Sequence, residues 1–488
     1  METIFEYDKS MMTFIEGIEN GGMDFLLGID IPTRVYKAKF QINEADNFEL
    51  AFTVPDGETF EAEYFFSKPA VLFVPGIIQV YLLNTDALSF SQSFNEKGPQ
   101  QVTVVYRSFG TEVDPAKWYK SKHCAYFRYN KKDFRYTDMS LKYDMTTDKN
   151  QRSSWRNAFV IGVGKDNSVI VSFEEGIPGD DAYCVFRAQK NMDYDSFEKI
   201  IESVRTVYGL FAGYSFADKG YFISDYIDEK PKDQAPLIMR YRNMVQSKKH
   251  KYPLLDTTHY VDDDHKNFEL TTEHLNRLVK LLMENEGYLR ATQLLIDASA
   301  IDGSSRGVLA VVALESISNQ LIKKGPAVKI ITDTTIASQL KYELNKGLKK
   351  IKDKIPAVIY EKLESKVNAV NNLPNAVKLE SVFELLGIEL NDEEQYCIYC
   401  RNLFLHGSLP KPDKMKFLTD NELVFMVSQR LIMLTAMLLL KKIGYTGSVN
   451  DWGYTEVVKL RAISEGRPLM HVGNAHRSLL FSRNKTTS

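Results

Sequence analysis

The sequence is poor in the residues that make covalent or metal-based cross-links. It contains four cysteines, Cys124, Cys184, Cys397 and Cys400, and eight histidines among 488 residues. Four cysteines at these positions give neither a disulfide framework nor a full tetrahedral zinc set. We therefore expect no metal and no cofactor, and the cytoplasm, a reducing compartment, is the expected location.

Two short clusters resemble metal or redox sites but lack what such sites need. Cys397 and Cys400 form a CxxC pair, yet neither a second pair nor suitably spaced histidines follow. They are expected in mid-helix, whereas a redox pair opens a helix after a strand, so we interpret them as structural cysteines. The run Asp-Asp-Asp-His at 262–265 has diverging carboxylates and would need ligands from elsewhere in the chain.

The chain also lacks a strong net charge and a long apolar run. Its net charge of −3 gives no overall attraction to nucleic acid, so any RNA contact requires a local basic patch. The longest apolar run, 431–440, is shorter than the roughly 20 residues of a membrane span. The first six residues have no cationic start and no apolar stretch, so we expect neither a secretion signal nor a membrane contact.

The remaining composition, 44% hydrophobic and 26% charged residues, is ordinary for a globular protein with a sizeable core. The length favours about two to four domains. We predict an α+β multidomain protein in four parts. They are a β-sandwich-like domain at 1–245, a linker at 246–269, an all-α helical bundle at 270–445 and a basic tail at 446–488.

The first half is predicted to be β-rich because short runs alternate polar with aromatic or β-branched residues. The histidine at its centre, His123, is expected at the surface or at a strand edge. One amphipathic helix is expected near 196–207. The expected strands are 34–40, 48–54, 60–66, 101–106, 125–129, 138–143, 158–163, 168–173, 184–187, 221–227 and 237–241.

The segment 243–268 mixes dense charges of both signs with a proline, which indicates a solvent-exposed crossing between domains. From about residue 270 the apolar residues recur at helical spacing. The run 308–314 is apolar on every side and predicts a helix in the middle of the bundle, and 431–440 predicts a core or a dimer face. Helices are expected near 335–354, 356–368, 379–386, 391–406 and 420–442.

One helical stretch carries the strongest basic patch in the sequence. Lys346, Lys349 and Lys350, followed by Lys352 and Lys354, are opposed locally by Asp353 alone. A surface that tracks phosphates has this composition, and the first three lysines are our candidates for RNA binding. The same pattern also suits an ordinary solvated helix face.

The segment 401–407, Arg-Asn-Leu-Phe-Leu-His-Gly, combines two residue types that handle phosphate chemistry. Arg401 offers a fixed cationic fork, and His406 transfers protons near neutral pH. Asn402 precedes His406 by four residues and shares its helix face, whereas Arg401 lies about 140° away. A capping box at 391–394 and Gly407 are expected to begin and end this helix.

This segment resembles the R-N-x-x-x-H motif of HEPN domains, in particular the Apea-like HEPN group. The resemblance implies metal-independent RNA cleavage by two HEPN domains that face each other, so a homodimer or a higher even oligomer is expected. It assigns phosphate binding to Arg401, general acid or base catalysis to His406, and an orienting role to Asn402. Glu315 follows the apolar run at 308–314 and is our candidate to pair with Arg401, or else is a rim carboxylate without a role.

The β-rich half is similar in order and architecture to the N-terminal module of ApeA-type anti-phage proteins. That similarity implies a sensor for a phage-derived trigger, followed by RNA cleavage and abortive infection. Two alternatives stay open. One is a catalytically inactive HEPN scaffold whose β-rich domain binds a carbohydrate or a protein. The other is a HEPN partner of a nucleotidyltransferase system, although the sequence carries no nucleotidyltransferase signature.

Overall fold

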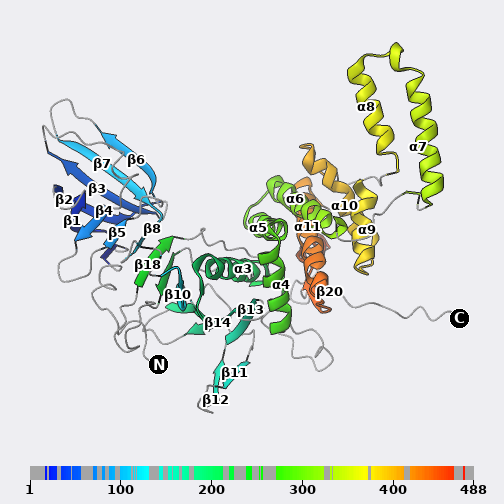
Figure 1. Ribbon diagram of the computed structural model, residues 1–488. Coiled ribbons are helices and arrows are strands. Elements are labelled where there is room, and N and C mark those ends of the chain that lie inside the picture. The colour runs from blue at the N-terminus through cyan, green and yellow to red at the C-terminus, as the bar shows by residue number, and fades with distance from the viewer. Residues whose placement is uncertain are drawn as a thin grey trace. The chain divides into compact units, whose positions relative to one another are not determined.

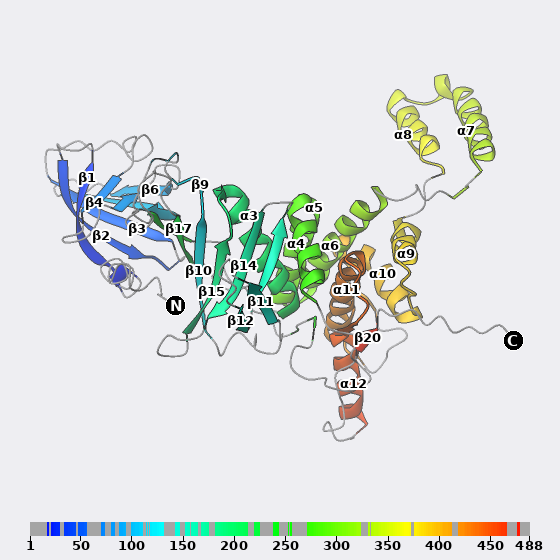
Figure 2. The ribbon, with the colours of Figure 1, turned by 60° about the horizontal axis from the view of Figure 1, so that its bottom comes forward.

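A computed structural model of the chain divides into two compact units, Met1–Glu202 with Phe216–Ser247, and Ser203–Ser215 with Lys248–Ser488. The first unit is β-rich and the second is helical (Figures 1 and 2), which is the α+β layout predicted from the sequence. The residues that the structure describes are 17–18, 21–29, 34–44, 47–55, 70–73, 80–82, 87–93, 99–110, 114, 116, 118–130, 142–146, 152–156, 158–163, 167–174, 181–212, 219–224, 238–243, 252, 254–255, 271–323, 330–331, 333–371, 375–411, 418–465 and 476–478.

The β-rich unit is built on one antiparallel sheet of fourteen strands, in the order β13-β14-β15-β10-β17-β18-β8-β5-β4-β1-β2-β3-β7-β6. Two short pairs, β11–β12 and β9–β16, lie outside it. The strands are β1 (Met23–Ile29), β2 (Arg34–Ile42), β3 (Phe48–Val54), β4 (Ala70–Phe73), β5 (Val80–Leu82), β6 (Ala87–Ser93), β7 (Gln100–Tyr106), β8 (Ser108–Gly110), β9 (Lys120–Ser121), β10 (His123–Asn130), β11 (Lys142–Thr146), β12 (Arg152–Arg156), β13 (Ala158–Val163), β14 (Asn167–Glu174), β15 (Asp181–Ala188), β16 (Met192–Asp193), β17 (Lys219–Ser224) and β18 (Ile238–Asn243).

Part of this sheet curls around an aromatic core. Phe109 of β8 lies 5.8 Å from Phe40 of β2 and 5.1 Å from Phe48 of β3, measured between ring centroids. Three or more strands separate β8 from β2 and β3 in the sheet, so these rings meet only because the sheet bends back on itself. The inward-facing residues of β3 alternate with more exposed ones, as the period of two predicts.

The prediction of a β-rich domain is confirmed, but its strands form one curled sheet where two stacked sheets were expected. The strand expected at 60–66 lies outside the described residues. The strand expected at 138–143 is described only from Lys142 onward. β13 and β14 pair directly as a hairpin from Ala158↔Ser172 to Val163↔Asn167, and the other strands fall where the alternation placed them, within a few residues.

The prediction that His123 lies at the surface or at a strand edge is wrong, because His123 is 1% exposed and β10 lies inside the sheet. Its side chain is buried between strand and helix, and its ring stacks on Phe197 of α3 (Tyr194–Ala212) with 5.3 Å between centroids. Its Nε2 lies 2.9 Å from the carbonyl oxygen of Met192, and its Nδ1 lies 3.2 Å from the Ser121 hydroxyl. A histidine can be buried here because both ring nitrogens have polar partners.

The helical unit contains nine α-helices among its described residues after residue 270. α6 packs against α5, α11, α10 and α9, and α11 packs against α6 and α12. The helices are α4 (Thr272–Glu284), α5 (Glu286–Ala300), α6 (Ser304–Lys323), α7 (Thr334–Lys349), α8 (Ala357–Asn368), α9 (Asn375–Leu385), α10 (Asp392–Leu405), α11 (Asp420–Lys442) and α12 (Trp452–Ser464).

α11 is the core helix of this unit, and its bounds match the predicted 420–442. The residues 431–440 are all buried within the single chain, so this run is core and offers no face to a second copy. By length and composition α11 is the one described helix that could cross a membrane, and 94% of its most apolar stretch is buried inside the protein. Its apolar composition is accounted for by that burial.

Described residues of the predicted linker and tail pack against the helical bundle, which was not expected. Within the predicted exposed crossing, Leu254 and Leu255 are buried, and the Tyr252 ring lies 5.3 Å from that of Phe425 in α11. The predicted tail contains α12 and a short strand pair, β19 (Ser448–Asn450) with β20 (His476–Ser478). The Asn450 amide donates to the Leu254 carbonyl at 2.9 Å, so Leu254 of the predicted linker and Asn450 of the predicted tail are in direct contact.

α7 and α8 form an antiparallel hairpin (Figures 1 and 2), and among the described elements each packs extensively only against the other. A short 3-10 turn, η5 (Lys352–Lys354), lies between them. Asn371 closes the base of the hairpin, because its side chain accepts from the Ile331 amide at 2.7 Å and donates to the Ile331 carbonyl at 3.1 Å. Leu348 is the one buried side chain described in α7.

Candidate functional site

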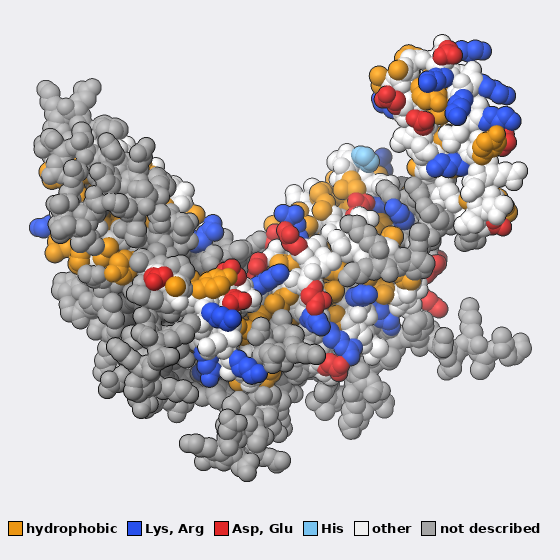
Figure 3. Space-filling view, in the orientation of Figure 1, with side chains coloured by type: hydrophobic (Ala, Val, Ile, Leu, Met, Phe, Trp, Pro, Cys, Tyr) orange, Lys and Arg blue, Asp and Glu red, His pale blue; other side chains and the backbone are white. Residues whose placement is uncertain are grey.

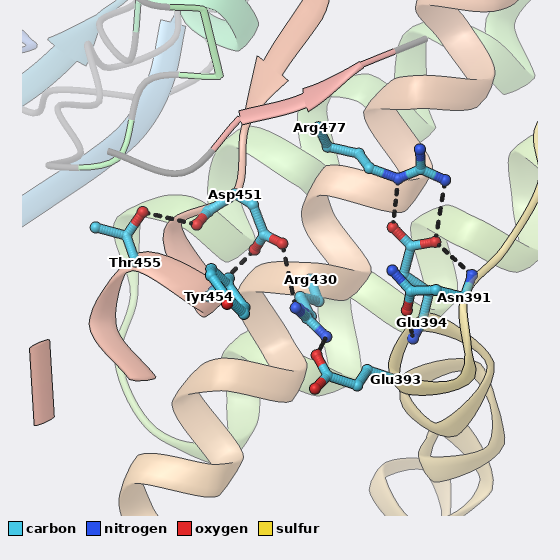
Figure 4. A network of polar contacts seen from close by, with 8 residues as sticks. All are labelled: Asn391, Glu393, Glu394, Arg430, Asp451, Tyr454, Thr455 and Arg477. Atoms are coloured by element: carbon cyan, nitrogen blue, oxygen red, sulfur yellow. Dashed lines mark hydrogen bonds and ion pairs between the residues drawn. The ribbon is translucent and has the colours of Figure 1, made fainter. Parts of the chain in front are cut away.

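The candidate site is organised by α10, whose first turn is fixed as the sequence predicted. Asn391 accepts from the Glu394 amide at 2.9 Å, and the Glu394 side chain accepts from the Asn391 amide at 3.0 Å. Glu394 is 1% exposed, and Arg477 of β20 binds both its oxygens, at 2.7 and 3.2 Å (Figure 4). The capping box follows from local sequence, but the arginine that neutralises it comes from 83 residues further on.

A second arginine holds the same turn from the core side (Figure 4). Arg430 of α11 is 3% exposed and binds Glu393 at 2.6 Å and Asp451 at 3.3 Å. Burial alone lowers the pKa of Arg430, but the two carboxylates outweigh it, so the pKa is raised and the charge is retained. Burial raises the pKa of Asp451 although Arg430 lowers it. These contacts tie α10, α11 and α12 together.

The CxxC pair lies in the middle of a helix, as expected. Cys397 and Cys400 are both buried on the inner side of α10. Burial raises the pKa of both thiols, which disfavours the thiolate that redox or metal chemistry requires. In the described part of the chain, no group of three or more His, Cys, Asp or Glu residues could hold a metal ion.

His406 caps the end of α10, and its backbone amide donates to the carbonyl oxygen of Asn402 at 3.1 Å. The next residue, Gly407, has a φ of 71°. This left-handed conformation is costly for residues with a Cβ atom, so glycine ends the helix here. The side chains of Asn402 and His406 are both exposed.

Arg401 points the other way, into the bundle. Its side chain is 2% exposed, and its Nε lies 3.4 Å from Oε1 of Glu315 on α6. The pairing of Glu315 with Arg401 predicted from the sequence is therefore present. Glu315 lies near the middle of α6, and its side chain is 35% exposed at the rim. Among the described residues, none accepts a hydrogen bond from the buried Nη1 of Arg401.

Helices α6 and α10 pack closely together where Gly307 of α6 faces an aromatic ring of α10. A Cβ atom at Gly307 would lie 2.5 Å from the Phe404 ring, far inside van der Waals contact. Phe404 is itself buried and follows Arg401 by one helical turn. The prediction that 308–314 is buried all round is wrong at Val312, which is 40% exposed, because the outer face of α6 is left uncovered there.

The structure does not bring all the predicted residues to one surface. Asn402 and His406 share an exposed face of α10, whereas Arg401 is enclosed behind them. Tyr399 joins the exposed pair: it precedes Asn402 by three residues and His406 by seven, and its side chain is 74% exposed. We did not single it out from the sequence, although its helical spacing from Asn402 and His406 marks it as a neighbour.

The candidate RNA-binding lysines Lys346, Lys349 and Lys350 lie on the last turn and cap of α7, away from the motif helix in the chain's packing. All three are exposed. They therefore form a separate feature of the helical unit. Compared with models of protein families, with curated proteins and with solved structures, the chain matches none of them.

Proposed function

We propose that the protein is a metal-independent endoribonuclease of the HEPN type, an effector of anti-phage defence that cleaves RNA as a pair of chains. One observation carries the proposal. The same helix end presents an exposed His406 and Asn402, together with an arginine that is tied to Glu315 and keeps Nη1 without a described acceptor. A cation and a proton-transfer group near the same helix end are what phosphodiester cleavage needs.

In the proposed reaction the RNA 2′-oxygen forms a bond to the adjacent phosphorus, and the bond from phosphorus to the 5′-oxygen breaks. His406 of one chain accepts the 2′-hydroxyl proton, and the partner's His406 supplies a proton to the leaving oxygen. Arg401 offsets the charge that develops on the phosphate. Asn402 holds the imidazole or a phosphate oxygen in place.

The enclosed position of Arg401 sets a condition on this proposal. A phosphate reaches Nη1 only if RNA or a second chain opens the end of α10. Tyr399 and Leu403 are 74% and 36% exposed and flank Asn402 and His406 on the same helix, so they supply apolar surface for such a contact. Because one chain holds one motif, the site is complete only in a dimer or a higher even assembly.

The test is RNA cleavage by purified protein in the presence of a metal chelator. Wild type should yield 2′,3′-cyclic phosphate ends, and His406→Ala should lower the rate by about a hundred- to ten-thousandfold. Gln395→Ala, at another exposed position of α10, is the control and should cleave normally. Circular dichroism should show the same fold in all three proteins.

A second candidate is a catalytically inactive scaffold whose β-rich domain binds a ligand or partner. The near-complete burial of Arg401 favours it, because an arginine locked to Glu315 serves the packing of α6 on α10. Under this alternative, the wild-type protein does not cleave RNA, and its expression does not arrest growth, either with or without phage infection. His406→Ala then behaves identically in both assays.

A further inference from the structure

The α7–α8 hairpin carries a net positive charge, whereas the rest of the chain taken together is negative. Residues 334–371 contain eight lysines and four carboxylates, a net charge of +4, within a chain whose net charge is −3. The remaining residues therefore sum to −7. All eight lysines are exposed, and Figure 3 shows blue side chains gathered over α7 and α8. The positive electrostatic potential of this hairpin attracts a polyanion.

One face of α7 combines these charges with an aromatic ring. Tyr342, Lys346 and Lys349 follow one another at steps of four and three residues, which places them in one row along the helix. Tyr342 is 64% exposed. Glu343, the one carboxylate of α7, lies about 100° around the helix from Tyr342 but three residues before Lys346, so it borders the row on one side. The row itself has a stacking surface and two cations.

Helix capping accounts for only part of this arrangement. Lys346 and Lys349 lie in the last turn of α7, where cations are favoured by the helix dipole. Lys352 is held over the Tyr360 ring at 5.6 Å and so serves the hairpin itself. Neither effect accounts for the exposed ring of Tyr342 in the same row.

We propose that Tyr342, Lys346 and Lys349, extended by Lys350 at the C-cap, bind single-stranded RNA. The lysines contact phosphates, and the Tyr342 ring stacks on an unpaired base, a combination that recognises single strands with little sequence preference. A base-paired duplex keeps its bases stacked inside and leaves Tyr342 without a partner. This inference rests on the proposed function, because it assigns a docking arm for the substrate of the α10 site.

The experiment measures binding without cleavage. Full-length His406→Ala is titrated into a fluorescently labelled single-stranded RNA of mixed sequence, and anisotropy is followed at several salt concentrations. Adding K346A, K349A and K350A should weaken binding by roughly tenfold or more and reduce the slope of log K against log salt by about 2. Tyr342→Ala should weaken binding by about five- to hundredfold, and Tyr342→Phe should bind like the parent.

A charge-matched control separates the row from general charge. K341A, K362A and K366A remove the same charge from other exposed positions of the hairpin and should leave most of the affinity. Equal weakening by both triple variants, or no weakening by the first, overturns the proposal. A hairpin that acts through a protein contact gives a third result. In that case the double variant Ile336→Ser/Leu340→Ser, at exposed apolar positions, changes the oligomeric state and RNA binding. The lysine variants then change neither property.

The two proposals fail separately. Wild type that binds RNA through these lysines but does not cleave it contradicts the ribonuclease and keeps the docking arm. Wild type that cleaves RNA, with affinity independent of Tyr342 and the lysines, contradicts the docking arm alone.

Discussion

Two buried arginines of the helical unit meet the cost of burial in different ways. Arg306 donates from Nε to the carbonyls of Ile301 at 2.8 Å and Ala298 at 3.3 Å, and it binds Asp302 at 2.6 Å. Arg401 has Glu315 as its one ion-pair partner among the described residues, at 3.4 Å. A buried cation with few acceptors depends more heavily on each one, so the two carboxylates are not equivalent.

We therefore predict that Glu315→Gln lowers the free energy of unfolding by about 1–3 kcal/mol, because it leaves the Arg401 guanidinium without its counter-charge. Asp302→Asn is the matched control. It should change stability little, since Asp302 is 97% exposed and Arg306 keeps its carbonyl acceptors. Urea denaturation of both variants measures the difference, and equal effects would show that Glu315 does not support Arg401.

At the residue scale, sequence reasoning succeeded where a physical rule left few options. An ionised carboxylate beside an apolar run must be paired or lie at a rim; pairing of Glu315 with Arg401 was one of these two interpretations, and the structure contains the pair. Sequence reasoning failed for His123, whose partners include the Ser121 hydroxyl, the backbone carbonyl of Met192 and the ring of Phe197. The sequence does not show that the Met192 carbonyl lies beside the imidazole ring, because the two residues are 69 positions apart. A buried histidine with polar partners was therefore predicted to lie at the surface.

At the element scale, we predict opposite changes in stability when two helical glycines are replaced by alanine. Gly307→Ala should destabilise the protein by about 1–3 kcal/mol, because its Cβ would lie 2.5 Å from the enclosed Phe404 ring and force α6 from α10. Gly347→Ala should stabilise it by about 0.5–1 kcal/mol, because its Cβ meets nothing within 4 Å and alanine favours a helix. Thermal unfolding of both variants checks the pair.

A second substitution shows whether the clash is the cause. Phe404→Leu in the Gly307→Ala background should restore part of the loss, because a smaller side chain admits the new methyl group. If Gly307→Ala is as stable as wild type, the helices are not in close contact at this point.

The elements that the sequence predicted best are those whose ends are determined by capping residues within a few positions. α10 and α11 begin at the capping boxes of Asn391 and Thr419, and these signals need no knowledge of the fold. The order of strands in the curled sheet depends on pairings between distant residues, which no local pattern specifies. The partner of Glu394 was missed for the same reason, since Arg477 arrives from the predicted tail.

For the whole molecule, we predict a loss of stability in alkali. Burial raises the pKa of Tyr288 and Tyr445 to about 12, above the ordinary value of about 10. The folded protein keeps these protons where the unfolded chain loses them. The free energy of unfolding should therefore be unaffected well below pH 10 and fall between about pH 10 and 12, by roughly 1.4 kcal/mol per pH unit for each group.

Urea midpoints measured across this range test the prediction, with Tyr288→Phe as the informative variant. The Tyr288 hydroxyl is buried with no partner among the described residues, so its removal should cost nothing near neutral pH and make the alkaline fall shallower. Tyr342→Phe, at an exposed position, should leave the slope unchanged. A slope that is identical in all three proteins would contradict the assignment.

The bond pair at Asn371 has a consequence for how this chain tolerates changes in length. Ile331 and Asn371 are joined by hydrogen bonds of 2.7 and 3.1 Å, so the chain enters and leaves the α7–α8 hairpin at a single point. An insertion with adjacent ends can be excised or exchanged at little cost to its host. The intervening segment is in this sense a cassette: a short linker in its place should leave the remaining helices folded, and a foreign helical pair should fit the same opening.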